Sequence, residues 1–488
     1  MLPRFQLDHD SETPLYQQLY EQFRTAIQSG KIAHGDRIPA SRELAGSLGL
    51  NRSTIALAFE RLEAEGLIRS HVGKGTFVES PEKRIDWAKL TPVEDAEPVE
   101  IANAIPPDAL ISFSASRPSK EQFPLEEFRA TVREVIDSKD AAQILQLGSA
   151  SGYAPLRRFM MDEARRQGVA RKDDDVLITS GAQQAFDLMQ RVLAPRGETV
   201  LIEDPVYPGI RNAFARGGAR VIGVPISEQG MDLVSLETLL NREHPRLLIV
   251  TPNFQNPTGT TIPLDARKTI LEMARTAGTI LIESDLYGSL RYKGEDVASI
   301  KKLDESGDTI LLGSFSKIAF PGLRVGWVIG PRHFIARLAE AKEASDLHSD
   351  QLSQAVLLRF AESGRLEAHR KKMIAAGAER LEACLAGCAK LPDSFFTKPE
   401  GGMNVWVQLP SAIDATELAK TALRENVSFL PGKYFAVSRP QTHSLRLCFA
   451  GLSPEHIRFG LQVLSNAIYE ELARARRTRS NDPLPALV

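Results

Sequence analysis

The chain has 488 residues, which is too long for one small hydrophobic core and predicts several domains. Its hydrophobic share of 43% and charged share of 25% are ordinary for a soluble globular protein, and no apolar run approaches the ~18 residues of a membrane span. A formal net charge of -2 gives no overall sign of nucleic-acid binding, and the first residues lack the apolar stretch of a secretory signal, so we expect a cytoplasmic protein that does not contact a membrane.

The first 80 residues carry three helical patterns followed by a β-hairpin pattern. In residues 13–29, apolar side chains recur every four positions, which places them on one face of a helix. Two further helices are predicted over residues 41–49 and 51–66, and both end at a glycine. The β-prone runs LIRS and GTFV then flank HVGK, as in a two-stranded hairpin. This order predicts an α+β winged helix-turn-helix domain over residues 1–80.

The rest of the chain predicts a linker and a larger α/β domain. Residues 81–111 are rich in proline and acidic side chains and fit no regular period, so we expect a linker. Between residues 112 and 475, β-prone runs alternate with helical stretches, which predicts a largely parallel sheet covered on both faces. Residues from about 370 to 475 mix helices with strand patterns and predict a smaller α+β domain within it. We expect residues 476–488 to be a disordered tail.

The three cysteines are too few for a disulfide framework. Cys384 and Cys388 lie four residues apart in an alanine-rich helical stretch, without a nearby histidine or further cysteine. We therefore expect no metal site and interpret both as small buried hydrophobic side chains, which suits a reducing compartment.

A lysine follows a predicted buried strand in GSFSKIAFPGLRVGW, residues 313–327. A lone lysine is usually a solvated surface charge, but Lys317 stands after the strand pattern TILLGS, and α/β sheets form their sites at the carboxyl ends of strands. Ser314, Ser316 and Arg324 would supply hydroxyls and a guanidinium, which are groups that bind phosphate. A lysine beside such groups suggests a phosphorylated aldehyde held as a Schiff base.

Other predicted strand ends carry groups that suit a planar phosphorylated ligand. In ITSGAQQAF, residues Gly181 to Gln183 open a predicted helix, whose free N–H groups can bind phosphate oxygens. In EDPVYPG, Tyr207 could stack on a planar ring or simply pack in its loop. Asn256, in TPNFQNPTG, could direct its amide to a ring hydroxyl. Asp285, in ILIESDLYG, could pair with a protonated ring nitrogen or could cap a helix.

The motifs SGAQQA, DPVYPG, NPTGT, SDLYG, SFSK and LRVGW occur together in this order. On these motifs, residues from about 112 to 475 resemble the fold-type I aminotransferases, which bind pyridoxal 5'-phosphate (PLP). The resemblance implies that Lys317 forms the Schiff base, that Asp285 pairs with the pyridine nitrogen and that Tyr207 stacks on the ring. It also implies that Asn256 and Tyr287 bind the ring oxygen. The residues that it assigns to the phosphate are Gly181, Ala182, Gln183, Ser314, Ser316 and Arg324.

The same resemblance implies a substrate site. SLRLCF resembles the strand with the family's carboxylate-binding arginine, here Arg446, whereas a strand arginine taken alone is usually part of a structural ion pair. Gly152, in SASGYAPLRR, falls where the family lines the substrate side, together with Asn256. Lys317 would move the proton at the substrate Cα, while Asp285 keeps the ring nitrogen protonated and Tyr207 stacks on the ring.

The first 80 residues resemble the GntR family of bacterial winged helix-turn-helix regulators. The resemblance rests on G-x-R-I-P-x-S-R-E-L-A, on the helix opening NRSTI and on a glycine-bounded wing. Residues 31–78 carry a small surplus of seven Lys and Arg over five Asp and Glu, and a winged helix used only for protein contacts is the alternative. The residues that the resemblance assigns to a double-stranded DNA operator are Arg42, Arg52, Ser53, Thr54, His71, Lys74 and Thr76.

The two resemblances, joined by a linker, describe the MocR subfamily of GntR regulators. The subfamily implies a homodimer whose aminotransferase-like body senses PLP, an amino acid or amine, or both, and whose paired heads bind two DNA half-sites. We therefore expect a PLP-binding transcriptional regulator. A working aminotransferase, acting on an amino acid and a 2-oxo acid, is the alternative, because every catalytic position that the motifs place is filled.

Overall fold

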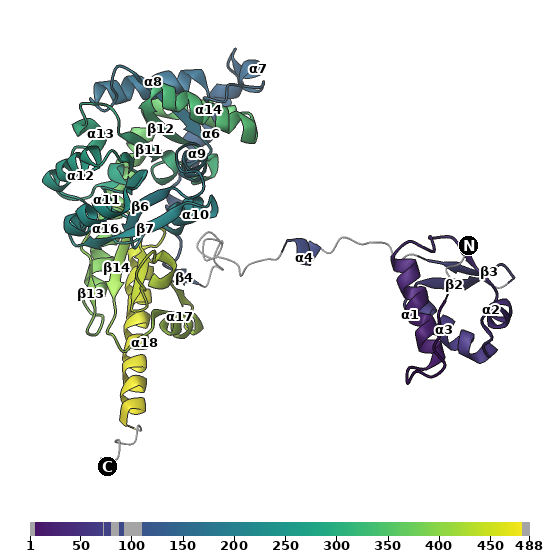
Figure 1. The fold of residues 1–488 in the computed structure, drawn as a ribbon. Helices are drawn as coiled ribbons and strands as arrows, with labels where there is room; N and C mark the ends of the chain where they lie inside the picture. The colour runs from purple at the N-terminus through teal and green to yellow at the C-terminus, as the bar shows by residue number, and fades with distance from the viewer. Residues whose placement is uncertain (1–4, 72, 80–86, 92–109, 481–488) are drawn as a thin grey trace. The chain divides into compact units, whose positions relative to one another are not determined.

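The computed structural model describes residues 5–71, 73–79, 87–91 and 110–480. The chain divides into two compact units, Met1–Ala96 and Glu97–Val488. We call the first unit, up to residue 79, the head, and residues 110–480 the body (Figure 1).

Three helices and a small antiparallel sheet form the head. The sheet has the strand order β1-β3-β2. This arrangement confirms the predicted winged helix-turn-helix, and it adds β1, which is too short to show a period in the sequence. The elements are α1 (Leu15–Gln28), β1 (Arg37–Ile38), α2 (Ser41–Leu48), α3 (Arg52–Ala64), β2 (Ile68–His71) and β3 (Gly75–Val78).

The apolar faces of the head helices form its core. Phe23 of α1 and Leu62 of α3 are fully buried, and the rings of Phe23 and Phe59 meet edge to face with centroids 5.9 Å apart. Gly49 ends α2 with a φ of 64°, a left-handed conformation that allows the tight turn into α3.

Little of the expected linker, residues 81–111, is described. Its described part holds the one-turn helix α4 (Trp87–Leu90) and the first residue of β4 (Ile111–Ser112). Ile111 pairs with Val427 of β15 (Val427–Ser428), so strand pairing in the body begins one residue before the boundary that we expected. The remaining linker residues lie outside the described part of the chain.

An eight-stranded sheet forms the centre of the body, in the order β5-β12-β11-β10-β9-β6-β7-β8. Its strands run parallel except β12 and β8, which pair antiparallel with their neighbours. The largely parallel sheet that the sequence predicts is therefore confirmed. The strands are β5 (Asp174–Thr179), β6 (Thr199–Asp204), β7 (Arg220–Ser227), β8 (Gly230–Met231), β9 (Leu247–Val250), β10 (Ile280–Ser284), β11 (Ile310–Ser314) and β12 (Gly326–Pro331).

Helices cover both faces of this sheet. Successive residues of a strand point to opposite faces, so each strand contributes side chains to the core on either side. Leu247 and Ile249 belong to the core under α9, α10 and α14, while Leu248 and Val250 belong to the core under α11 and α12. The helices are α6 (Leu125–Ile136), α7 (Ala141–Ile144), α8 (Ala154–Arg166), α9 (Ala182–Leu193), α10 (Pro208–Arg216), α11 (Leu233–Glu243), α12 (Leu264–Thr276), α13 (Ile300–Leu303), α14 (Arg332–Asp346) and α15 (Gln351–Glu362).

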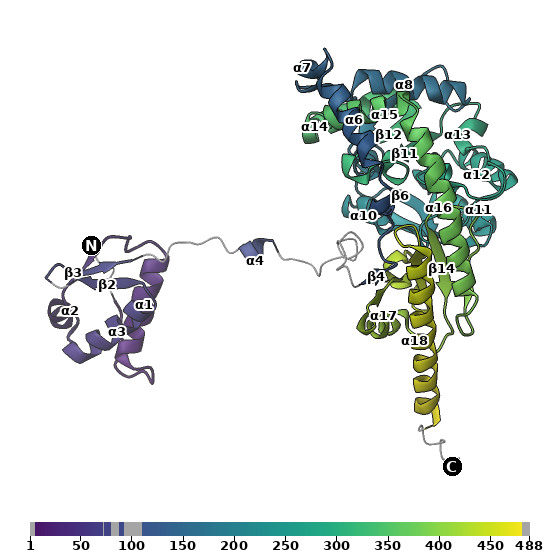
Figure 2. The same cartoon turned by 180° about the vertical axis from the view of Figure 1, so that it is seen from behind.

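A four-stranded antiparallel sheet, in the order β13-β14-β17-β16, and three helices form the small domain of the body. Helix α16 packs along α18 (Figure 2). This confirms the smaller α+β domain. Its elements are α16 (Arg365–Cys388), β13 (Phe395–Phe396), β14 (Asn404–Gln408), α17 (Ala415–Arg424), β16 (Leu430–Pro431), β17 (Ser444–Cys448) and α18 (Pro454–Ser480).

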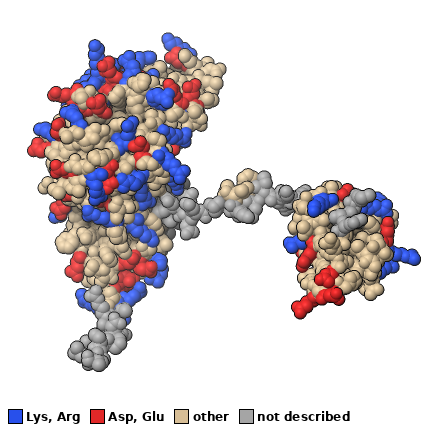
Figure 3. Space-filling view, viewed as in Figure 1, with Lys and Arg blue, Asp and Glu red and all other residues tan. Residues whose placement is uncertain are grey.

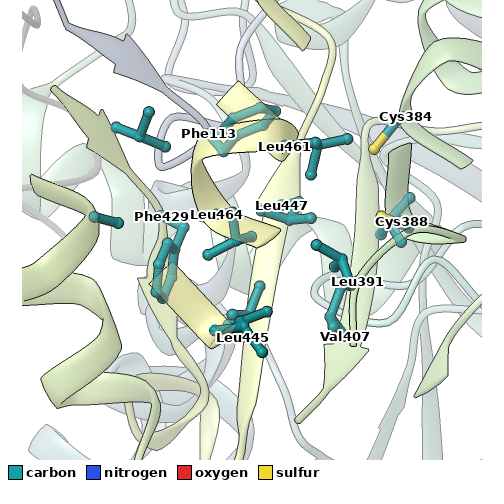
Figure 4. Packing of buried hydrophobic residues seen from close by; sticks show 14 of the residues in the cluster. Phe113, Cys384, Cys388, Leu391, Val407, Phe429, Leu445, Leu447, Leu461 and Leu464 are labelled. Atoms are coloured by element: carbon teal, nitrogen blue, oxygen red, sulfur yellow. The ribbon is translucent and has the colours of Figure 1, made fainter. Parts of the chain in front are cut away.

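Cys384 and Cys388 lie in the apolar core of the small domain (Figure 4). Both thiols are free and buried, which confirms that they serve as small hydrophobic side chains. A hydrogen bond to Cys388 and burial together raise the pKa of the Cys384 thiol. Such a thiol stays protonated and unreactive at neutral pH.

Helix α18 continues to Ser480, five residues into the segment 476–488 that we expected to be disordered. Arginine favours helices, and neither glycine nor proline interrupts RARRTRS, so nothing local ends the helix at residue 475. The last eight residues lie outside the described part. Within the described residues, no helix is long and apolar enough to cross a membrane.

We expect Phe23→Ala to unfold the head selectively. The ring is fully buried, and the cavity left by its removal should cost roughly 3–5 kcal/mol. Because the head is a compact unit of its own, calorimetry should show one transition at lower temperature while the body's transition stays in place. Leu57→Ala, at a side chain that is 49% exposed, is the control and should cost less than about 1 kcal/mol. A single calorimetric transition, shifted to lower temperature for head and body together, would contradict independent unfolding of the head.

Candidate ligand and cofactor site

A cavity of about 150 Å³ lies at the carboxyl ends of β9, β10 and β11. Side chains of the large sheet and of the small domain both contribute to its wall. The structure brings many of the sequence-predicted residues together here. Those that line the cavity are Ala182, Gln183, Tyr207, Asn256, Tyr287, Ser314, Ser316, Lys317, Arg324 and Arg446.

Lys317 ends the 3-10 turn that follows β11, as the strand pattern predicts. Its Nζ donates to Ser116 O at 2.6 Å and lies 5.6 Å from the centroid of the Tyr287 ring. Within the described residues, no carboxylate pairs with this amine. A lysine held only by a backbone carbonyl can leave that bond and react with a ligand in the cavity.

Asn256 joins groups from the two domains in the cavity wall. Its Nδ2 donates to Tyr287 Oη at 3.1 Å, and its Oδ1 accepts from Arg446 Nη1 at 3.2 Å. Tyr287 follows β10 of the large sheet, whereas Arg446 lies on β17 of the small domain. One amide therefore fixes the position of both side chains.

Arg446 is a buried cation that has no acidic partner among the described residues. It is 1% exposed, its Nη2 donates to Ser114 O, and its guanidinium lies 5.1 Å from the centroid of the Phe435 ring. Its buried Nε has no hydrogen-bond partner, and burial lowers the pKa of the guanidinium. The structural ion pair that we considered is not formed, and the site favours an anionic ligand.

Backbone and side-chain donors gather at the N-terminus of α9. Gly181 precedes this helix with a φ of 81°, and a Cβ there would overlap the guanidinium of Arg324. Arg324 Nη2 donates to Ser180 O at 3.2 Å, and Ser314 Oγ donates to Ser316 Oγ at 3.0 Å. Free N–H groups, hydroxyls and a guanidinium in this arrangement suit a phosphate.

Asp285 does not itself line the cavity, but its neighbours Ser284 and Leu286 do. Its Oδ1 accepts from Asn253 Nδ2 at 3.2 Å and from the backbone N–H of Gly288 at 2.9 Å, the second bond being a local cap. Burial raises the pKa of this carboxyl, and both hydrogen bonds oppose the rise. Among the described groups, none donates to Oδ2, so this oxygen can accept a further hydrogen bond.

Of two other predicted residues, Tyr207 lines the cavity and Gly152 does not. Tyr207 lines the cavity just before α10, and burial raises the pKa of its hydroxyl, which therefore stays neutral. Gly152, expected on the substrate side, is not brought to this cavity. Its backbone packs against Ile178 of β5, where an added Cβ would lie 2.5 Å from Ile178 Cβ. The glycine serves this close approach within the body.

Sequence reasoning missed several lining residues. Thr251 and Ser284 stand at the ends of predicted strands, so the rule that sites form there could have identified them. Tyr434 and Phe435 belong to a 3-10 turn of the small domain, and no local pattern indicates that this turn meets the large sheet. The backbone N–H of Val206 donates to Phe435 O at 2.9 Å and holds the two regions together.

The predicted DNA-binding residues of the head are largely exposed. Arg42, Arg52, Ser53, His71 and Lys74 are exposed, while Thr54 and Thr76 are half-buried. In the described part of the head, no acidic side chain pairs with the two arginines or the lysine. Figure 3 shows both basic and acidic side chains on one face of the head, and the surplus of seven Lys and Arg over five Asp and Glu is confined to residues 31–78.

The fold and the cavity define the body as a fold-type I α/β protein of the PLP-dependent class, preceded in the same chain by a winged helix-turn-helix. Residues 109–464 match the family described as aminotransferase class I and II, and residues 15–78 match the bacterial regulatory proteins of the gntR family. The chain belongs to the aminotransferase class I and II family and, with both parts in one chain, to the MocR subfamily of GntR regulators.

Relatives of two kinds are similar to this chain. Aromatic-amino-acid aminotransferase 1 of Thermococcus litoralis is 36% identical over 383 residues, covering 77% of this chain and 92% of that protein. The probable rhizopine catabolism regulatory protein MocR of Rhizobium meliloti is 28% identical over 476 residues, covering 94% and 95%. The crystal structure of Pyrococcus horikoshii kynurenine aminotransferase superposes with a TM-score of 0.75 at 34% identity, covering 79% of this chain and 96% of that one.

PLP is the cofactor of this class, and the cavity fits it. Three buried polar atoms of lining residues lack any hydrogen-bond partner: Ser116 Oγ, Ser284 Oγ and Arg446 Nε. Such atoms are costly unless a ligand or water binds them. The absence of a side chain at Gly181 lets the Arg324 guanidinium lie close to the N-terminus of α9, and the donors gathered there match phosphate oxygens.

We expect Gly181→Ala to weaken PLP binding by at least about tenfold, because its methyl group would displace the Arg324 guanidinium from the phosphate donors. Gly197→Ala is the matched control: its φ is 95°, yet nothing lies within 4 Å of the added Cβ. It therefore carries the backbone cost without the clash. Titration of the PLP-free protein with PLP measures both affinities. Equal losses of PLP affinity in the two variants would contradict the placement of the PLP phosphate beside Arg324.

Proposed function

We propose that the protein is a PLP-binding transcriptional regulator, which binds DNA through its head and an amino acid together with PLP in its body. The observation that carries the proposal is the presence of a GntR head and an aminotransferase-like body with a lysine-lined cavity in one chain. The similarity to MocR of Rhizobium meliloti supports it, because that similarity extends over 94% of this chain. We also propose a cytoplasmic location, because a DNA-binding regulator acts where the DNA is.

Each end of PLP has a proposed partner in the cavity. When bound, PLP supplies a ring that withdraws electrons from bonds at the substrate Cα. Lys317 would hold PLP covalently, Asp285 Oδ2 would accept the ring N–H, and Tyr207 would stack on the ring. Asn256 and Tyr287 would donate to the ring oxygen. The residues proposed for the phosphate are Gly181, Ala182, Gln183, Ser314, Ser316 and Arg324.

The amino acid would bind between Arg446 and Lys317. A guanidinium presents paired N–H donors that match a carboxylate, and the unpartnered Nε of Arg446 is available for this bond. Lys317 Nζ would accept the proton from the substrate Cα and return it. The apolar side chains Leu430 and Phe435 line the same cavity and would keep water from these groups.

We also propose that two chains form a homodimer through their bodies. Leu147 and Leu347 are 77% and 60% exposed and border a second hollow of the body. Exposed apolar side chains that gather around a hollow favour a protein contact. Two heads in one dimer would then bind two DNA half-sites.

A working aminotransferase is the second candidate function. The specific observation in its favour is that Tyr207, Lys317 and Arg446 line one cavity, with Lys317 and Arg446 both free of acidic partners within the described residues. The aminotransferase of Thermococcus litoralis, at 36% identity over the body, supports this alternative.

The two functions differ in the expected effect of an amino acid. For a regulator, one of the common amino acids should change the affinity of the PLP-loaded protein for an operator, selected by the full-length chain from random DNA, by at least about threefold. Release of 2-oxo acid should stay at or below one equivalent per chain, even with a 2-oxo acid acceptor present. Fluorescence anisotropy and mass spectrometry measure the two quantities.

Two variants control this experiment. Arg446→Met should abolish the response to the amino acid but not PLP binding, and Lys317→Ala should lose the borohydride-reducible bond to PLP. Sustained turnover, together with operator affinity that no amino acid changes, would overturn the regulator in favour of the enzyme.

In the head, we expect Arg52→Ala to weaken operator binding by about tenfold or more and to leave PLP affinity unchanged. The exposed guanidinium opens α3 and would contact a base or a phosphate. Arg24→Ala is the matched control, since Arg24 pairs with Glu65 at 3.4 Å on the head and the variant removes the same charge. Equal operator affinity of Arg52→Ala and the unaltered protein would show that the recognition surface lies elsewhere.

A further inference from the structure

Arg267 of α12 is a fully buried cation whose five N–H donors are all used. Each of its acceptors is neutral, so the bonds satisfy the donors but leave the positive charge without a counter-charge in direct contact. The contacts are Nε to Ile262 O at 2.8 Å, Nη1 to Val297 O at 3.2 Å and Ala298 O at 3.0 Å, and Nη2 to Pro252 O at 2.9 Å and Asn253 Oδ1 at 2.6 Å.

One of these contacts leads to Asp285. Asn253 accepts from Arg267 through Oδ1 and donates through Nδ2 to Asp285 Oδ1 at 3.2 Å. A guanidinium can only donate and an ionised carboxylate can only accept, so a single orientation of the Asn253 amide satisfies both neighbours. The backbone N–H of Gly288 donates to the same Asp285 oxygen. A proton is therefore disfavoured on Oδ1, and Oδ2 is left for a further partner.

Glu283 is the other acidic group near Arg267. Both of its oxygens already accept from backbone N–H groups, those of Ile300 at 2.9 Å and Lys301 at 2.8 Å. Burial raises the pKa of Glu283 to about 7, with repulsion from Asp285 as a further cause. Below that pH the Glu283 carboxyl is mostly neutral and offsets little of the charge of Arg267. Asp285 is the acid that the Asn253 amide connects to Arg267.

We propose that Arg267 and Asn253 are positioning residues that keep Asp285 ionised and oriented for a protonated ring nitrogen. This rests on the proposed function, in which Asp285 Oδ2 accepts the ring N–H of PLP. The buried cation favours the charged form of the carboxylate through the intervening amide, and the two bonds to Oδ1 hold the side chain in one rotamer. Neither residue lines the cavity, so both act only through Asp285.

The test compares PLP with its 1-deaza analogue, in which C–H replaces the ring nitrogen. Both compounds keep the aldehyde and the phosphate, so the ratio of their affinities for the PLP-free full-length protein isolates the contact to the ring nitrogen. We expect the unaltered protein to prefer PLP by about tenfold or more. Asp285→Ala should bind both equally well and sets the baseline.

Three variants then test the positioning role. Asn253→Ala and Arg267→Met should each reduce the preference for PLP at least about threefold. Asn253→Asp should reduce it further, because its carboxylate pairs with Arg267 but repels Asp285. A merely structural role predicts the reverse, since the new ion pair would hold Arg267 in place. Arg275→Met, which removes the same charge from the same helix where Arg275 faces Asp304, should keep the full preference.

The outcomes separate this proposal from the proposed function. If Asp285→Ala still prefers PLP, Asp285 does not contact the ring nitrogen, and the proposed placement of the cofactor ring against Asp285 is wrong. If Asp285→Ala loses the preference while the Asn253 and Arg267 variants keep it, the positioning role is wrong and the assignment stands. If Arg267→Met does not fold, the two Asn253 variants decide the question. The positioning role predicts a weaker preference for PLP in Asn253→Asp than in Asn253→Ala, and a merely structural role predicts the opposite order.

Discussion

Two buried arginines without acidic partners among the described residues set the electrostatics of the body. Burying an unpaired cation is costly, so each must be compensated by something other than a direct ion pair. Arg446 keeps one N–H without a partner beside the cavity, which favours an anion as ligand. Arg267 uses all five donors inside the protein, and its charge acts on Asp285 through Asn253. In the proposed function, Arg446 would bind the ligand directly, and Arg267 would act on Asp285, the carboxylate proposed to face the cofactor's ring nitrogen.

The cavity depends equally on contacts between the two parts of the body. Asn256 follows β9 of the large sheet, yet it holds Arg446 of the small domain at 3.2 Å and Tyr287 at 3.1 Å. The N–H of Val206 binds Phe435 O next to the same wall. Any change in the position of the small domain must therefore disturb groups that face the ligand. This coupling gives a regulator's body a physical means to respond to an anion bound at Arg446.

The sequence predicted the fold class and most of the cavity because strand ends of a parallel sheet meet at one edge, and motifs after strands mark that edge. Lys317 and Asn256 were found this way, whereas Tyr287 was implied by the resemblance to the aminotransferases. Local patterns could not place Tyr434 and Phe435, since their position depends on how the small domain packs on the sheet. Gly152, which the resemblance assigned to the substrate side, does not line this cavity, and its positive φ and close packing on Ile178 account for a glycine there. Arg267 was missed because a helix arginine is usually solvated.

Two buried glutamates lie in the large sheet, Glu283 on β10 near Arg267 and Glu203 on β6. Burial raises the pKa of Glu203 to about 8 and that of Glu283 to about 7, from an ordinary value of 4.5. Both bind a proton more tightly in the folded protein than in the unfolded chain, so their contribution to stability is complete at low pH and is lost as the pH rises toward these values. Below about pH 7 both are mostly neutral, and the counter-charge of Arg267 falls on Asp285. Above that pH Glu283 ionises as well, and its negative charge also faces Arg267.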